Sequence, residues 1–163
     1  MLQVITLVII AALIAADQII KLVVLEHLAP VESITLIDRF LSLTYVENTG
    51  AAFGSFSSHT EVLSIFTALV LAVGLFYLLK GKVRSKLAYA CLTVIIAGGI
   101  SNLLDRVFRG FVVDYIEPLF VNFAVFNFAD ILVTCGAFVL IFYLIYDMFK
   151  GSGTHENGGN NNE

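Results

Sequence analysis

Four apolar stretches, each long enough to cross a lipid bilayer as a helix, constrain this chain more than any other feature. A membrane-spanning helix needs about 20 mostly apolar residues. The stretches cover residues 2–25, 62–79, 87–104 and 126–149. Of the 163 residues, 59% are hydrophobic and 13% are charged, far from the roughly 25% charged residues of soluble domains. The sequence therefore predicts an all-α polytopic membrane protein with four transmembrane helices.

The loop between the second and third stretches predicts the orientation of the chain. It carries Lys80, Lys82, Arg84 and Lys86 within seven residues, and loops rich in lysine and arginine stay in the cytoplasm. Both termini are then expected in the cytoplasm, and the connections 26–61 and 106–125 on the outer side. The first stretch has no basic residue before it and no clear cleavage site after it, so we expect it to be retained as a span.

The outer connection over residues 28–60 is expected to hold a small β-rich cradle. Two runs of β-branched and aromatic residues flank Asp38-Arg39, which predicts a pair of strands on the membrane surface. The run that follows contains Gly50 and Gly54, which suits a tightly turning backbone. We expect one domain over residues 1–150 and a disordered polar tail over 151–163.

Polar residues inside the predicted spans gather at one depth. Asp130 lies near the start of the fourth span, where a carboxylate is costly and is by default a candidate functional group. The inner halves of the four spans carry almost nothing ionisable. The other polar groups without an evident role also lie at the outer ends of the spans, and two more lie on the outer connections beside them. The full set is Asp17, Lys21, Asn48, Asn102, Asp105, Arg106, Asp114, Asn127 and Asp130.

Each of these groups also has a local explanation. Asp17 and Lys21, one helical turn apart, could form an interfacial ion pair with a snorkelling lysine. Asn127 could cap the fourth helix, with Asp130 favoured by the helix dipole. Gly98, with its glycine neighbour, could permit close helix packing. Independent caps and ion pairs would scatter over both membrane faces, so their gathering on one side favours a shared site.

Two carboxylates meeting at the membrane surface favour aspartic peptidase chemistry. Such a pair shares a proton, so one carboxylate acts as a base for water and the other as an acid for the scissile carbonyl. Spacing alone leaves two partners for Asp130, namely Asp105 and Asp114. Asp105 precedes Arg106, which predicts a local charge pair, whereas Asp114 lies in an apolar run that would raise its pKa.

Other classes of function are disfavoured. The net charge of −4 and the lack of a long basic run argue against nucleic acid as a partner. His27, His59 and His155 lie far apart, so no metal or other cofactor is expected, and Cys91 and Cys135 are interpreted as small buried hydrophobic residues. A small transporter or channel subunit is the alternative. It is disfavoured because the chain has no internal repeat and its polar groups line no path to the other face.

Five ordered blocks of the sequence resemble the signature blocks of the bacterial lipoprotein signal peptidases, or signal peptidase II. The resemblance runs from the first to the fourth predicted helix and leaves out only the polar tail. One position departs from the family pattern, since Ser101 stands where the family commonly has glycine. The blocks are DQIIK at 17–21, ENTGAAFG at 47–54, AGGISNLLDR at 97–106, GFVVDY at 110–115 and FNFAD at 126–130.

The resemblance implies an intramembrane aspartic endopeptidase of the bacterial inner membrane with four helices and an extracytoplasmic β-cradle. Its partners would be membrane lipids and diacylglyceryl-modified prolipoproteins, cleaved on the amino side of the lipidated cysteine, and we expect a monomer. The family's catalytic pair falls on Asp114 and Asp130. Its supporting positions fall on Asp17, Lys21, Asn48, Gly50, Asn102, Arg106, Asn127 and Ala129. Phe53 and Phe56 could close over the site or anchor the loop in the membrane.

Overall fold

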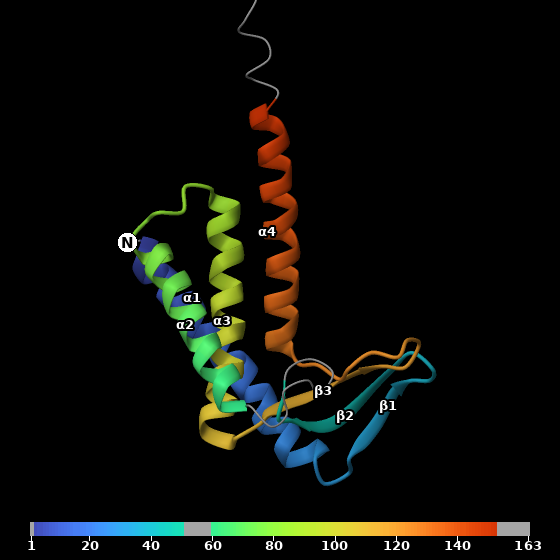
Figure 1. The fold of residues 1–163 in the computed structure, drawn as a ribbon. Helices are drawn as coiled ribbons and strands as arrows, with labels where there is room; N and C mark the ends of the chain where they lie inside the picture. Colours follow the sequence, from blue (N-terminus) through green and yellow to red (C-terminus); the bar gives the residue numbers. More distant parts are fainter. Residues whose placement is uncertain (1, 51–59, 153–163) are drawn as a thin grey trace, which may run out of the picture.

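The computed structural model describes residues 2–50 and 60–152 and consists of four helices and a three-stranded sheet (Figure 1). The helices are α1 (Leu2–Val23), α2 (Thr60–Leu79), α3 (Lys86–Arg109) and α4 (Phe128–Ser152). The strands are β1 (Ser33–Ile37), β2 (Leu41–Asn48) and β3 (Val112–Pro118). A π-helical turn, η1 (Val24–Leu28), continues α1 toward the sheet. The predicted lid residues Phe53 and Phe56 and most of the polar tail lie outside the described residues.

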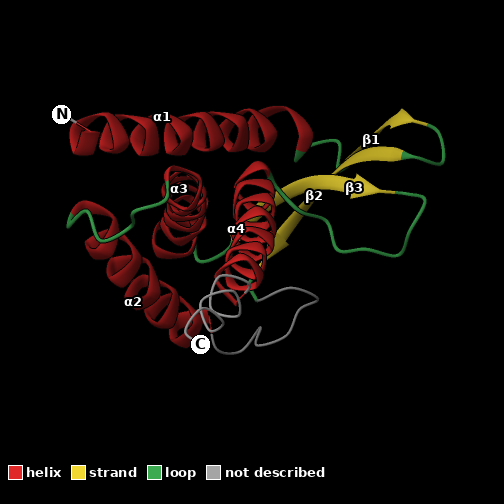
Figure 2. Cartoon of the chain, turned by 90° about the horizontal axis from the view of Figure 1, so that it is seen from above, coloured by secondary structure: helices red, strands yellow, loops and turns green. Residues whose placement is uncertain are grey.

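Helix α3 is the centre of the helical part, because it packs against each of the other three helices (Figure 2). Two adjacent glycines allow this packing. A Cβ atom on Gly98 would lie 2.5 Å from the carbonyl oxygen of Ala129 on α4, and one on Gly99 would lie 2.6 Å from Leu71 on α2. The expectation that these glycines permit close helix contact is confirmed.

Three helices are long and apolar enough to cross a membrane, counted over the described residues: 2–28, 86–109 and 128–150. The fourth apolar helix, Ser64–Leu79, is shorter. Many large apolar side chains on these helices are exposed, as expected where the surrounding medium is lipid. The chain is therefore a multi-pass membrane protein, and α2 as a fourth span stays a prediction.

The sheet confirms the two strands that were expected on either side of Asp38-Arg39. β1 and β2 form an antiparallel pair, and Arg39 in the turn between them has a φ of 59°. The third strand, β3, was not predicted. It pairs antiparallel with β2, and Asp114 lies opposite Val46 in the register. The π-helical turn covers this sheet with Val24 and Leu28.

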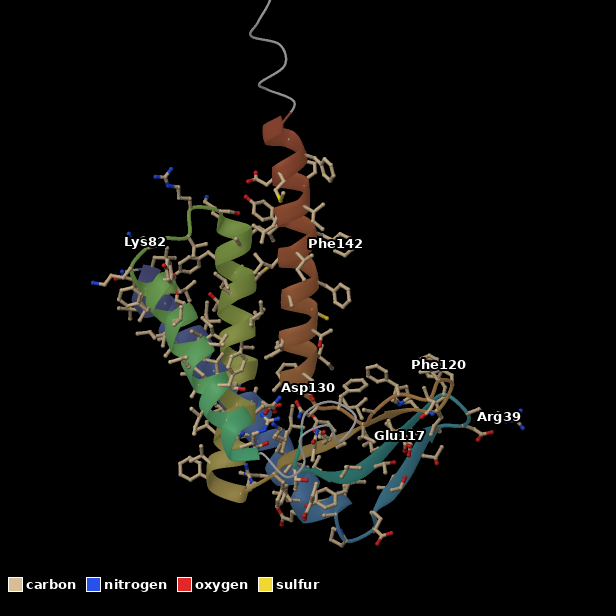
Figure 3. All side chains as sticks on the ribbon, viewed as in Figure 1. Arg39, Lys82, Glu117, Phe120, Asp130 and Phe142 are labelled. Carbon is tan, nitrogen blue, oxygen red and sulfur yellow. The ribbon has the colours of Figure 1, made fainter. Side chains whose placement is uncertain are left out.

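The sheet and the lysine-rich loop lie at opposite ends of the helices. Figure 3 shows Lys82 near one end and Asp130, beside the sheet, near the other. Helix α3 continues for five residues beyond the apolar stretch, which ends at residue 104, and stops before Gly110, whose φ of 83° suits glycine. The prediction for Cys135 was wrong, because it is exposed, whereas Cys91 is buried.

Candidate active site

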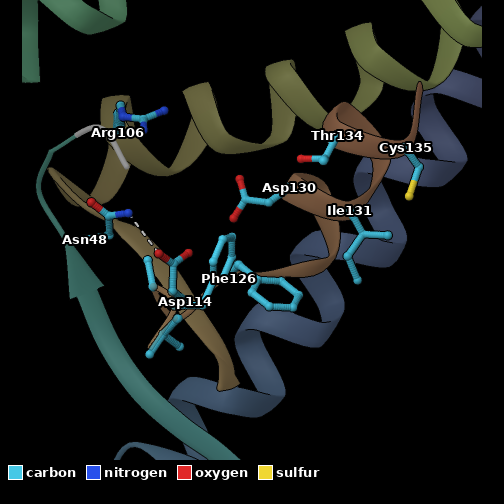
Figure 4. A pocket seen from close by; sticks show the side chains of 11 residues that line it. Asn48, Arg106, Asp114, Phe126, Asp130, Ile131, Thr134 and Cys135 are labelled. Carbon is cyan, nitrogen blue, oxygen red and sulfur yellow. Dashed lines mark hydrogen bonds between the residues drawn. The ribbon is translucent and has the colours of Figure 1, made fainter. Parts of the chain in front are cut away.

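A cavity of about 360 Å³ opens between the first turns of α4 and the sheet (Figure 4). Both Asp114 and Asp130 line it, one from β3 and one from α4. Its polar wall is completed by Asn48 and Arg106. The remaining lining residues are Phe123, Ala124, Val125, Phe126, Ile131, Thr134 and Cys135. Asp105 is not among the lining residues.

Asp130 is held by the start of helix α4. The Asn127 side-chain oxygen accepts the Asp130 backbone N–H at 2.9 Å, and Asp130 Oδ2 accepts the Asn127 backbone N–H at 3.1 Å. This reciprocal pair is a capping arrangement, so the local explanation for these residues is confirmed. The other oxygen of Asp130 accepts the side-chain amide of Asn102 at 2.8 Å, which ties α4 to α3.

Asp114 is buried on β3, with 1% of its surface exposed. Its two oxygens accept side-chain amide hydrogens from Asn127 at 2.6 Å and from Asn48 at 2.9 Å. The pKa of Asp114 is raised to about 6, mainly by burial. The charge of Asp130 contributes to this rise, and the hydrogen bonds from Asn48 and Asn127 oppose it. Asn127 thus contacts both carboxylates, and each oxygen of the pair receives one hydrogen bond.

Asp105 is committed to other partners. It forms an ion pair with Lys21 at 2.7 Å and a second with Arg109, and it accepts the backbone N–H of Val113 at 3.4 Å. The predicted local pair between Asp105 and Arg106 is therefore wrong, and Arg109, one turn further along α3, takes that place. The geometry favours Asp114 over Asp105 as the partner of Asp130.

Asp17 and Lys21 form the expected ion pair at 2.8 Å, but both are completely buried. The snorkelling interpretation was wrong, because Lys21 points into the protein toward Asp105 rather than to a membrane interface. Asp17 accepts the backbone N–H of Ala129 at 2.9 Å and the hydroxyl of Ser101 at 2.7 Å. Asp17 thereby joins α1 to α3 and to the first turn of α4.

Arg106 and Gly50 meet at the edge of the cavity. The guanidinium of Arg106 donates to the carbonyl oxygens of Gly50 and of Asn102, both at 3.4 Å. Its Nε has no hydrogen-bond partner within the described part of the chain. Gly50 donates its backbone N–H to the side-chain oxygen of Asn48 at 3.0 Å, which orients the Asn48 amide toward Asp114.

Four residues that support the site were not predicted from the sequence to do so. Gln18 donates to Ser101 and Asp105 at 3.0 Å, and Tyr115 accepts the backbone N–H of Phe128 at 3.2 Å. Arg109 and Ser101 complete the group. Gln18 and Tyr115 lie inside the quoted signature blocks, which was the only signal available for them. Among the described residues there is no group of three or more histidine, cysteine or acidic side chains that could hold a metal ion.

The family model described as Signal peptidase (SPase) II matches residues 9–146 of this chain. A lipoprotein signal peptidase of Clostridium acetobutylicum is 39% identical over 148 residues, which cover 89% of this chain and 96% of that protein. A lipoprotein signal peptidase of Lactococcus lactis subsp. lactis is 42% identical over 143 residues, which cover 88% of this chain and 94% of that protein.

Two solved structures, both described as bacterial membrane enzymes studied by the in meso method, have a similar fold. The structure at 2.3 Å resolution superposes with a TM-score of 0.78 at 26% identity, covering 97% of this chain and 93% of that one. The structure at 1.9 Å resolution gives a TM-score of 0.77 at 28% identity, covering 87% and 93%. The fold of this chain is therefore similar to that of two bacterial membrane enzymes over most of its length.

Proposed function

Since the chain belongs to the signal peptidase II family, we propose that it is an intramembrane aspartic endopeptidase that removes signal peptides from diacylglyceryl-modified prolipoproteins. One observation carries the catalytic assignment: Asp114 and Asp130 line the same cavity and are both hydrogen-bonded by Asn127. Cleavage occurs on the amino side of the lipidated cysteine. No feature of the cavity favours the transporter alternative.

Asp114 and Asp130 form a catalytic dyad in which one carboxyl group acts as a base and the other as an acid. The ionised carboxylate takes a proton from a water molecule, whose oxygen bonds to the scissile carbonyl carbon, while the protonated carboxyl gives its proton to the carbonyl oxygen. Collapse of the tetrahedral intermediate breaks the C–N bond, and the proton taken from water passes to the departing amine of the lipidated cysteine. As the C=O bond forms again, one hydroxyl proton of the intermediate returns to the carboxylate that had given its proton, so the pair regains its single shared proton. No covalent enzyme intermediate is formed.

The supporting residues hold this geometry. Asn48, Asn102 and Asn127 donate amide hydrogens to the two carboxylates at 2.6–2.9 Å, which fixes both side chains. Arg106 also lines the cavity, and the carbonyl oxygens of Gly50 and Asn102 hold its guanidinium in place. Gly50 holds Asn48 and Arg106 through its backbone groups.

The position of the cavity suits a substrate anchored in lipid. It lies at the end of the helices beside the sheet, away from Lys82 (Figure 3), and the positive-inside rule assigns that end to the extracytoplasmic side. The described lining is mainly apolar, with Phe123, Phe126 and Ile131 beside the dyad. We propose a single domain over residues 1–150 in the bacterial inner membrane, with both termini in the cytoplasm.

The test compares two forms of one substrate. The purified protein in detergent is incubated with a diacylglyceryl-modified prolipoprotein and with the same precursor carrying serine in place of its acceptor cysteine, which blocks lipid attachment. We expect release of the signal peptide only from the lipidated form, because buried acyl chains contribute about 0.8 kcal/mol of binding free energy per CH₂. Equal turnover of both forms would refute the substrate assignment, and cleavage of neither would refute the activity.

A further inference from the structure

The ammonium group of Lys21 is completely buried, and three oxygen atoms surround it. Its Nζ lies 2.8 Å from Asp17 Oδ2, 2.7 Å from Asp105 Oδ2 and 2.8 Å from the side-chain oxygen of Asn102. An ammonium group has three hydrogens to donate and cannot accept. All three donors therefore have a partner, and the position of the charge is fixed by α1 and α3.

This fixed charge determines which way the amide of Asn102 faces. The Asn102 oxygen accepts from Lys21 at 2.8 Å and from the Asn127 side chain at 3.2 Å, while its NH₂ donates to Asp130 at 2.8 Å. The reversed amide would turn its NH₂ toward the ammonium and its oxygen toward the carboxylate, so every one of these contacts would become repulsive. The contact with Lys21 therefore keeps the Asn102 amide in the orientation in which its NH₂ donates to Asp130.

The charges that face Asp130 come from three elements. Lys21 on α1 acts through one amide group, Arg106 on α3 lines the same cavity, and Asp114 on β3 is the opposing acid. The hydrogen bonds from Lys21 to Asn102 and from Asn102 to Asp130 run in one direction. Such a chain polarises each bond in the same sense and favours the ionised carboxylate at its end.

We propose that Lys21 is a positioning residue for the cleavage reaction: it holds the amide of Asn102 as a donor to Asp130, and so keeps Asp130 as the dyad member that takes the proton from water. The inference rests on the proposed function. Asp114 is then the member that carries the proton. Lys21 itself does not contact the cavity and touches no substrate atom.

The experiment uses double variants, because removing Lys21 alone would leave Asp17 and Asp105 facing each other without a counter-charge. Lys21→Met with Asp105→Asn removes one charge of each sign together with the donor to Asn102. Lys21→Gln with Asp105→Asn removes the same charges but keeps an NH₂ donor on the side of Asn102, on a side chain one bond shorter than lysine. Asp105→Asn alone is the reference, and Lys82→Met in the exposed loop is the matched control for removal of a lysine.

The readouts are kcat, KM and the pH dependence of kcat on a diacylglyceryl prolipoprotein, per mole of folded protein. Relative to the reference, the Lys21→Met double variant should lower kcat about 100-fold with KM unchanged. The acid limb of its pH profile should move up by about one pH unit. The Lys21→Gln double variant should recover most of the lost kcat.

Three results would overturn the inference: equal kcat and equal pH profiles for the two double variants, a loss confined to KM, or a loss confined to the amount of folded protein. If the double variants do not fold, Asn102→Leu decides, since leucine keeps the shape of the side chain but cannot donate to Asp130. We expect a similar loss of kcat and a similar pH shift, and wild-type values would contradict the role. Failure of the proposed function is distinct, because the wild-type protein itself would then not cleave the lipidated substrate.

Discussion

Replacing Asp114 by asparagine should make the protein more stable at neutral pH even though it removes the proposed acid. Burial, with the charge of Asp130 adding to it, raises the pKa of Asp114 from 3.8 to about 6. A carboxyl group whose pKa is higher in the folded than in the unfolded protein holds its proton more tightly when folded. The free energy of unfolding therefore falls as Asp114 loses its proton between pH 3.8 and pH 6. Below pH 3.8 Asp114 is protonated in both states and the free energy of unfolding is not reduced.

The size of the effect follows from the two pKa values. One pKa unit corresponds to about 1.4 kcal/mol, so the ionised Asp114 costs about 3 kcal/mol of folding free energy above pH 6. In the Asp114→Asn variant, the new side-chain oxygen can accept a hydrogen bond from only one of the two amides of Asn48 and Asn127. The new NH₂ group then faces the NH₂ group of the other one, and this unfavourable contact costs about 1–2 kcal/mol of folding free energy. We expect Asp114→Asn to be more stable than wild type by about 1–2 kcal/mol at pH 8 and less stable by a similar amount at pH 4.

Thermal unfolding in detergent from pH 4 to 8 measures this difference. For a chain of this size, 1 kcal/mol corresponds to about 2–4 °C in Tm, so the Tm of the variant relative to wild type should rise by about 6–12 °C across the range. Asp38→Asn, at an exposed turn position, is the matched control for loss of a carboxylate. A Tm difference that stays constant with pH, or that grows toward acid, would refute the reasoning about Asp114.

Three further outcomes follow from the packing and the orientation. Gly98→Ala would place a methyl group 2.5 Å from the Ala129 carbonyl oxygen, so it should destabilise the protein by about 1–3 kcal/mol; an unchanged Tm would contradict the close helix contact. Ser101→Gly removes a donor to Asp17 and should cost about 1 kcal/mol of stability while cleavage persists, as measured by unfolding and turnover. A reporter fused after Lys82 should be cytoplasmic and one in the β1–β2 turn extracytoplasmic; the opposite labelling would invert the proposed orientation.

The helices and the first two strands could be predicted from the sequence because their signals are local. A continuous apolar stretch of about 20 residues predicts a helix without information from the rest of the chain. The two strands are likewise indicated by the two runs of β-branched and aromatic residues on either side of Asp38-Arg39. Strand β3 was missed because a strand in a connection is stabilised by its partner β2 rather than by its own pattern. The exposure of Cys135 was missed for a related reason, since an apolar sequence does not reveal which face of a helix meets the protein.

In the candidate site, too, the contacts within one helix could be predicted from the sequence, whereas the contacts between elements could not. The pair formed by Asp17 and Lys21 follows from their spacing of one turn, but the burial of Lys21 does not, because it depends on Asp105 from another helix. Asp105 was assigned to its sequence neighbour Arg106. Its partners are Lys21 from α1 and Arg109, which lies four residues further along α3 and therefore on the same helix face. Sequence reasoning found which residues gather, and the structure shows which contacts they make.

The central claim is that Asp114 and Asp130 form the catalytic dyad, and the most direct test is the cleavage rate of three single variants on a diacylglyceryl prolipoprotein. Asp114→Asn and Asp130→Asn should each lower the rate by about 10²–10⁴-fold or more in folded protein, because an amide keeps the shape but transfers no proton. Asp105→Asn should lower the yield of folded protein and reduce the rate only in part, because Asp105 serves Lys21 and Arg109. Substantial turnover by folded Asp114→Asn, beside an inactive and equally folded Asp105→Asn, would contradict the account.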